Sequence, residues 1–222
     1  VKKKWIINRP DGEKVSRLAS SLGLTNLVSS ILVSRGIDSE QSAKAFLHPE
    51  LSSLPDPNLM TDMEIAVSRI LSAMKAGEKI GVFGDYDVDG ATGAALLSNF
   101  FRESGFEVFT ILPNRSEGYG LLKSHIHRFK DAGTSLIITV DNGIRAVEEA
   151  ALAAELGMDL VITDHHELGE SLPKSCAVIN PHRNEPNSPF ANLCGCGVAF
   201  MLILALRKAM RGAGLFNSAE PN

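Results

Sequence analysis

The chain has 222 residues, of which 44% are hydrophobic and 22% charged, and these proportions exclude a disordered or fibrous protein. The formal net charge of −4 does not by itself indicate nucleic-acid binding, because phosphate backbones attract basic surfaces. The longest apolar run, Val198 to Leu206, is too short to span a bilayer, and three cysteines, an odd number, argue against a disulfide framework. We therefore expect a soluble, cytoplasmic protein without membrane partners.

The first part of the chain is expected to be helical. Apolar residues recur at helical spacing between Leu24 and Leu32, and Gly36 follows as a stop signal. A further helix is expected over 39–47, and the turn-rich segment 54–58 is typical of a linker. We predict a small helical region over residues 1–60 and a second domain over residues 61–222.

After Gly77 the pattern changes to short strands that alternate with helices. The strands are almost entirely apolar, which is typical of strands buried on both faces of a parallel sheet. The predicted fold is therefore a doubly wound α/β domain with a mainly parallel sheet. The expected strands cover 80–83, 108–112, 136–140 and 160–163, with a further candidate at 177–179, and the expected helices cover 62–76, 91–104, 121–132, 144–156 and 197–211.

Acidic residues and histidines follow the ends of three of these strands. The first strand leads into Asp85, Asp87 and Asp89, the third into Asp141, and the fourth into residues 164–166. In an open α/β sheet, ligands bind beyond the carboxyl ends of the strands, so the three groups should meet at one edge. The two-residue spacing of the first three acids would let an extended or turning backbone bring their carboxylates to one spot.

This set of side chains favours a divalent metal site. Clustered carboxylates repel one another unless they bind protons or cations, and carboxylates with one or two imidazoles suit Mn²⁺ or Mg²⁺ better than soft metals. The same Asp-x-Asp-x-Asp-Gly pattern opens a calcium-binding loop, but that loop needs a Glu where this chain has Leu96. A solvated turn would explain the Asp141 group alone, but not all three groups at successive strand ends.

These motifs resemble a known family. Asp85-Tyr-Asp-Val-Asp-Gly90, Val140-Asp141 and Asp164-His165-His166 resemble the first three motifs of the DHH phosphoesterases, which are named for the third. Flanking segments are similar to the branch that contains bacterial exonucleases specific for single-stranded DNA, and the resemblance extends over nearly the whole chain. These flanking segments are 113–121, 180–183 and 193–200, together with the helices before the first motif.

The resemblance implies an activity and its metal ligands. The activity would be metal-dependent 5′→3′ exonuclease cleavage of single-stranded DNA, releasing 5′-mononucleotides in DNA recombination and repair. Two Mn²⁺ or Mg²⁺ ions would activate a water for in-line attack on phosphorus. By the resemblance, Asp87 and Asp89 each hold one ion, Asp85 lies at the first, Asp141 bridges both, and His165 binds the second.

The resemblance also implies which residues are catalytic. These are Asp141, His165 and His166, and His166 would contact the scissile phosphate. Asp164 would orient its neighbours rather than bind metal.

Four loop residues are candidates for binding DNA. Arg115 follows a strand on the same edge as the acids and could bind a phosphate with its planar guanidinium, and Tyr119 could stack on a base. His182 and Arg183 also follow a strand and could line the cleft. An ordinary loop role fits each of them as well.

Two further features lie outside the motifs. His125 and His127 are two residues apart on an expected helix, so they do not share a face and are not expected to form a site. Gly195 and Gly197 bracket the start of an apolar helix, whose N-terminus could hold an anion.

The chain departs from the family because it lacks the fourth motif, an Asp that completes the second metal site, and the family's further domains. We therefore expect the catalytic part of a longer protein, with weak or absent activity on its own and with single-stranded DNA and other repair proteins as partners. Two alternatives remain: a DHH phosphodiesterase for short oligonucleotides or cyclic dinucleotides, and a non-catalytic binding scaffold. The helices before the first motif and segment 113–121 count against the former, and the intact acids count against the latter.

Overall fold

The computed structural model describes residues 9–215. Contacts within the chain divide it into two compact units, Val1–Pro55 and Asp56–Asn222, and each is described by itself. The sequence predicted a boundary after residue 60, whereas the structure assigns the end of the linker to the second unit. The reason is packing: Met60 is buried in the core of that unit, and Lys208 Nζ lies 3.2 Å from Asp56 Oδ2.

The first unit is a small bundle of three α-helices, α1 (Gly12–Leu22), α2 (Asn26–Ser34) and α3 (Glu40–Leu47), followed by the short helix η1 (Leu51–Ser53). Each α-helix begins after a residue whose side chain accepts hydrogen bonds from the first turn: Asp11, Thr25 and Ser39. The core contains only a few buried side chains, led by Leu18 and Leu32. The expected helical region is thus present.

The second unit is built on a sheet of five parallel strands, which confirms the predicted α/β fold. The order of the strands is β2-β1-β3-β4-β5. Because the chain leaves β1 toward one side of the sheet and continues from β3 toward the other, the switch point lies between β1 and β3. The strands are β1 (Ile80–Gly84), β2 (Val108–Ile111), β3 (Leu136–Val140), β4 (Asp159–Thr163) and β5 (Ala177–Ile179).

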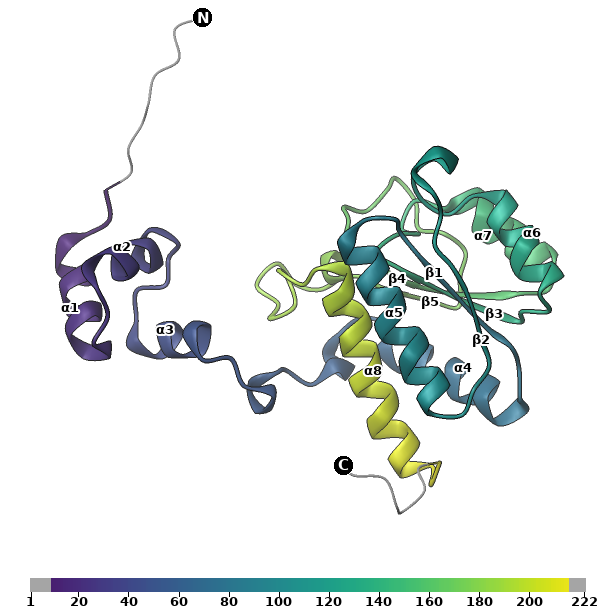
Figure 1. Ribbon diagram of the computed structural model, residues 1–222, viewed down its shortest axis with the longest axis horizontal. Coiled ribbons are helices and arrows are strands. Elements are labelled where there is room, and N and C mark those ends of the chain that lie inside the picture. The colour runs from purple at the N-terminus through teal and green to yellow at the C-terminus, as the bar shows by residue number, and fades with distance from the viewer. Residues whose placement is uncertain (1–8, 216–222) are drawn as a thin grey trace, which may run out of the picture. The chain divides into compact units, whose positions relative to one another are not determined.

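Helices cover both faces of this sheet (Figure 1). On one face α4 (Met63–Ala76), α5 (Val88–Glu103) and α8 (Gly195–Gly212) pack together over strand residues such as Ile80 and Leu136. On the other, α6 (Lys123–Asp131) and α7 (Val147–Glu155) cover the alternate strand residues. Short helices η2 (Pro57–Leu59), η3 (Arg115–Glu117) and η4 (Pro181–Arg183) lie in the connections. None of the helices described over residues 9–215 is long and apolar enough to cross a membrane.

Helix α5 begins earlier than the sequence predicted. The Asp87 side chain accepts a hydrogen bond of 2.9 Å from the backbone N–H of Gly90 and so caps the helix, which starts at Val88 rather than at residue 91. Asp89 therefore lies in the first helical turn and not in an extended segment. Of the three acids, only Asp85 and Asp87 belong to the connection between β1 and α5.

Candidate active site

The register of the sheet places the three acidic groups in a row. Gly84 pairs with Val140, and Val140 pairs with Thr163. The next residue on each strand is an aspartate, so Asp85, Asp141 and Asp164 follow the ends of three neighbouring strands at the switch point. All three aspartates are 1% exposed.

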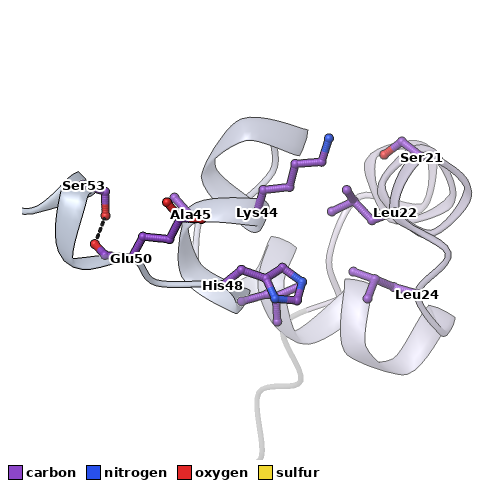
Figure 2. A pocket seen from close by; sticks show the side chains of 9 residues that line it. Ser21, Leu22, Leu24, Lys44, Ala45, His48, Glu50 and Ser53 are labelled. Carbon is purple, nitrogen blue, oxygen red and sulfur yellow. Dashed lines mark hydrogen bonds between the residues drawn. The ribbon is translucent and has the colours of Figure 1, made fainter.

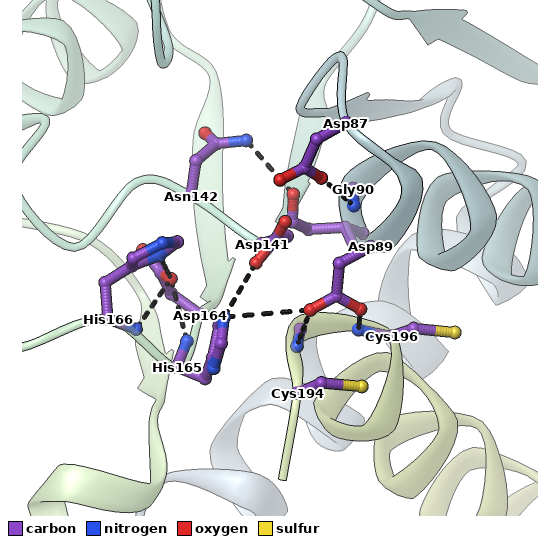
Figure 3. A network of polar contacts seen from close by, with 12 residues as sticks. Asp87, Asp89, Gly90, Asp141, Asn142, Asp164, His165, His166, Cys194 and Cys196 are labelled. Carbon is purple, nitrogen blue, oxygen red and sulfur yellow. Dashed lines mark hydrogen bonds and ion pairs between the residues drawn. The ribbon is translucent and has the colours of Figure 1, made fainter. Parts of the chain in front are cut away.

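Side chains from α5 and from the ends of β3 and β4 converge here (Figure 3). His165 Nε2 lies 3.1 Å from Asp141 Oδ1 and 3.6 Å from Asp89 Oδ2. Asp141, His165 and His166 each offer one ligand atom, and these atoms lie within 4.8 Å of one another, as a single metal ion requires. The structure thus brings the second and third motifs together with Asp89.

Asp141 is held in an unusual and costly state. Its backbone has φ of 62°, in the left-handed region that non-glycine residues rarely adopt. Burial, together with the negative charges of Asp89 and Asp87, raises the pKa of Asp141 to about 7. Such a carboxylate is stabilised by a cation, so its environment fits a metal ion.

The N-terminus of α8 holds Asp89. The backbone N–H groups of Gly195 and Cys196 donate to the two oxygens of its carboxylate at 2.6 and 2.7 Å. Partial burial raises the pKa of Asp89, but the hydrogen bonds from these two donors outweigh burial and keep the pKa below its ordinary value. The anion expected at this helix N-terminus is therefore Asp89 itself.

Gly195 is required at this contact by close packing. A Cβ atom built on Gly195 would lie 2.4 Å from Asp141 Oδ1, far inside van der Waals contact. Helix α8 therefore approaches both acids directly, and its first residue must lack a side chain.

Asp164 orients the residues that follow it. Its Oδ1 accepts hydrogen bonds from the backbone N–H of His165 (2.7 Å) and of His166 (3.1 Å), and it lies 2.7 Å from His166 Nδ1. Its Oδ2 accepts from the backbone N–H of Ile144 at 2.9 Å. Because both of its oxygens are engaged by protein groups, Asp164 acts as an anchor for the two histidines.

His166 faces Tyr119 on its other side, where Nε2 lies 3.2 Å from the tyrosine hydroxyl. Partial burial lowers the pKa of His166, but the hydrogen bond and charge of Asp164, with the charges of Asp141 and Asp85, outweigh it and raise the pKa above its ordinary value. The contact with Asp164 thus stabilises the protonated form of the His166 ring relative to a free imidazole.

A second observation also indicates that these side chains fit a divalent cation. Among the residues that the structure describes, Asp85 Oδ2 is a buried oxygen with no hydrogen-bond partner, and the buried Asp141 Oδ1 faces His165 Nε2 at 3.1 Å. Burial also raises the pKa of Asp85. Unpartnered buried carboxylate oxygens beside imidazole nitrogens are the ligands that Mn²⁺ and Mg²⁺ bind in proteins.

An aromatic and basic rim borders this cluster. The guanidinium carbon of Arg115 lies 5.6 Å from the centre of the Tyr86 ring, and Tyr86 meets Tyr119 edge to face at 6.3 Å. Two of the predicted DNA-binding residues, Arg115 and Tyr119, are thus brought to the acids. Tyr86 was not predicted from the sequence, although its position between Asp85 and Asp87 was a signal that it lies at the site.

The other two predicted DNA-binding residues have different neighbours. His182 Nδ1 lies 4.0 Å from Glu167 Oε1, at the edge of the acidic cluster. Arg183 is largely buried, and its guanidinium pairs with Asp62 and donates to the carbonyl of Val178. Arg183 therefore ties the start of α4 to β5, and its contacts are those of a structural residue.

Two hollows differ in their relation to this cluster. A cavity of about 400 Å³ opens beside His166 and is bordered by Tyr119, Asn142 and Arg145. A larger hollow of about 610 Å³ lies within the first unit, where Figure 2 shows its lining by residues such as His48 and Lys44. The second hollow contains no cluster of acids, so only the first belongs to the candidate site.

The geometry matches a known family. The model of the family described as "DHH family, N-terminal domain" matches residues 79–218. The chain therefore belongs to the DHH family, as the sequence motifs predicted.

Within this family, the chain is similar to the single-stranded-DNA-specific exonuclease RecJ. It is 44% identical to RecJ of Bacillus subtilis over 92% of this chain and 26% of that protein, and 38% identical to RecJ of Escherichia coli over 90% of this chain and 35% of that protein. The chain thus spans about a quarter to a third of the length of these relatives.

Solved structures give the same result. An exonuclease RecJ bound to manganese is 33% identical and matches with a TM-score of 0.65 over 72% of this chain and 40% of that one. RecJ of Thermus thermophilus in complex with Mn²⁺ is 26% identical, with a TM-score of 0.71 over 92% of this chain and 28% of that one.

Proposed function

We propose that the chain is the catalytic part of a metal-dependent exonuclease that degrades single-stranded DNA from the 5′ end and releases 5′-mononucleotides. The observation that carries this proposal is the convergence of Asp89, Asp141 and His165 at the switch point of the sheet, next to a buried oxygen of Asp85 that has no hydrogen-bond partner. The similarity to exonucleases named for single-stranded DNA supports the substrate.

Two divalent ions, Mn²⁺ or Mg²⁺, are the proposed cofactors. Asp85, Asp87, Asp89, Asp141 and His165 would hold them. When bound, such ions supply Lewis acidity that activates water and offsets the charge of the phosphate. The relatives whose structures contain manganese support this choice.

The histidines of the third motif would act on the phosphate. The contact between His166 Nδ1 and Asp164 fixes the ring and leaves Nε2 directed toward Tyr119 and the open side of the site. A proton held at Nε2 would donate to an oxygen of the scissile phosphate and stabilise the charge that develops there. Asp164 would position this ring without touching the substrate.

Arg115, Tyr119 and Tyr86 would bind the DNA strand. A guanidinium beside two aromatic rings can pair with a phosphate while the rings stack on bases. The cavity beside His166 has the volume of a small-ligand pocket and would accommodate the terminal nucleotide. His182, at the edge of the cluster, would contribute to the same surface, and Arg183 would contribute only if it left Asp62.

We assign the protein to DNA recombination and repair in the cytoplasm, with other repair proteins as partners. This assignment follows from the proposed substrate, since free single strands arise in those processes.

The test uses the full-length protein with single-stranded DNA labelled at the 5′ or the 3′ end. Immediate release of the 5′ label as a mononucleotide in Mn²⁺, lost on addition of EDTA and in Asp141→Ala, is the expected result. Because Asp141 lies at the centre of the residues that would hold the ions, we expect the substitution to lower kcat/KM by at least about a thousandfold.

Other outcomes of the same assay point to the alternative functions. Hydrolysis of dinucleotides or cyclic dinucleotides, with long strands left intact, would make the protein a phosphodiesterase for small substrates. No hydrolysis of either substrate would leave the scaffold alternative standing, and a titration with Mn²⁺ would then test it, since a scaffold need not bind the ion tightly.

A further inference from the structure

His125 is buried and fully paired, although it lies outside the motifs. It is 0% exposed, on the first turn of α6, and its ring lies 4.9 Å from the ring of Phe83. The backbone N–H of Leu122 donates to His125 Nδ1 at 3.1 Å. The ring proton therefore belongs on Nε2, which lies 3.1 Å from Glu117 Oε2 and donates to it.

Glu117 connects this histidine to the loop that precedes α6. Its Oε1 accepts hydrogen bonds from both the backbone N–H (2.9 Å) and the side-chain amide (3.1 Å) of Asn114. The donors on Asn114 and the hydrogen bond from His125 lower the pKa of Glu117. One carboxylate thus joins the start of the loop to a buried ring.

Glu117 Oε2 also lies 3.7 Å from Arg128 Nη1, but that side chain is half exposed, so the buried ring of His125 is the fixed partner of the segment Asn114–Gly120, called the rim loop below. Residues 114–119 are exposed, and Gly118 and Gly120 have positive φ values of 100° and 84°. Yet this loop carries Arg115, near the Tyr86 ring, and Tyr119, whose hydroxyl lies 3.2 Å from His166. An exposed, glycine-containing loop needs a fixed support if it is to present two side chains at defined positions.

We propose that His125 is a positioning residue, which acts through Glu117 to fix the rim loop so that Arg115 and Tyr119 are presented to the DNA strand. The inference rests on the proposed function for its substrate. Its geometric part, that the His125–Glu117 contact orders the loop, stands without any activity. His125 itself does not touch the substrate.

Two variants of the full-length protein test this role. His125→Asn keeps an acceptor for the N–H of Leu122 but removes the donor to Glu117. Glu117→Ala removes the acceptor at the surface and leaves the core intact. It therefore still tests the contact if His125→Asn folds poorly. The matched control is His127→Asn, since His127 is an exposed histidine on the same helix.

The first readout is tryptic cleavage after Arg115. We expect it to be about tenfold faster in both variants, the size expected for the loss of one hydrogen bond to a charged group. Cleavage elsewhere in the chain and the Tm of the control variant should not change. Cleavage after Arg115 at the native rate in both variants would overturn the proposal, as would equal acceleration at all sites.

The second readout is the split between KM and kcat on single-stranded DNA. KM should rise about tenfold while kcat changes little, because Asp164 still holds His166. In a Tyr119→Ala background the loss caused by His125→Asn should shrink, since both changes act through one loop. Additive losses would overturn the positioning role. If the native protein cleaves no DNA, the proposed function fails, whereas the proteolysis still decides whether His125 orders the loop.

Discussion

Asp89 illustrates how single residues are held at this site. Its carboxylate accepts hydrogen bonds from two backbone N–H groups of α8, and its Oδ2 also lies 3.6 Å from His165 Nε2. The two donors thus fix this carboxylate with its Oδ2 beside His165 (Figure 3). The same helix end touches Asp141 through Gly195, so two acids depend on one close approach.

A methyl group at position 195 should therefore disturb metal binding. Because its Cβ would lie 2.4 Å from Asp141 Oδ1, Gly195→Ala is expected to displace that carboxylate and to weaken Mn²⁺ binding by about tenfold or more. Isothermal titration with Mn²⁺ measures this. Gly197→Ala is the control, because the nearest atom to its Cβ would be the end of the Leu193 side chain, at 3.2 Å, and no acid of the site lies among its near neighbours. Equal affinities of the two variants would contradict the role of Gly195.

The sequence predicted which side chains form the site better than it predicted the backbone groups that hold them in place. Asp141 and the third motif could be located because acids and histidines directly follow apolar strands, and parallel strand ends share one edge. The start of α8 was predicted to be able to hold an anion, but Asp89 could not be assigned as its partner, since which acid packs against a helix end is set by the tertiary fold. Whether each side chain binds a metal ion stays a prediction.

At the scale of elements, periodicity located the strands and helices closely, but caps shifted their ends. The apolar runs predicted the strands because β1, β3 and β5 are buried on both faces and β4 nearly so, whereas β2 at the edge of the sheet is only partly buried. Helix α5 was predicted to begin at residue 91, and the cap formed by Asp87 moves its start to Val88. An aspartate with a role in both a cap and an acidic motif is ambiguous in sequence, which explains this difference. The helix predicted from residue 144 also differs, since α7 begins at Val147.

The contact of Arg183 with Asp62 joins two elements, α4 and β5. Asp62 Oδ2 also accepts from the backbone N–H of Val178 at 3.1 Å, so removing either partner leaves polar groups unpaired. We expect Arg183→Met and Asp62→Asn each to lower the free energy of unfolding by about 2 kcal/mol. Urea denaturation measures this, with the exposed Arg211→Met as a control that should change little.

The same variants separate this structural role from DNA binding. If Arg183 contacts DNA, Arg183→Met will raise KM for single-stranded DNA, whereas Asp62→Asn will not. Matching effects of the two variants on stability, with KM unchanged in both, are the expected result.

At the scale of the whole second unit, the site joins separate parts of the chain. Its residues come from the end of β1, the first turn of α5, the ends of β3 and β4, and the N-terminus of α8. A ligand that binds these residues together binds the folded unit and not the unfolded chain, so binding and folding are linked.

Mn²⁺ should therefore stabilise the protein. At a concentration about a hundredfold above Kd, the free energy of unfolding should rise by about 2.7 kcal/mol, and EDTA should reverse the change. Thermal unfolding with and without Mn²⁺ measures this. Asp141→Asn, which removes a charge from the site, should lose most of the shift. A shift of native size in this variant would show that the stabilising ion binds elsewhere.

The backbone donors at the start of α8 also affect which mutations the site can tolerate. Peptide N–H groups are the same for every residue type except proline, so a change of side chain at Cys196 leaves its N–H in place for Asp89. Random mutagenesis should thus recover active proteins with many residues at position 196, few at position 195 and no proline at 196. The hydrogen bonds that hold Asp89 thus depend on the position of the α8 backbone more than on which side chains its first residues carry.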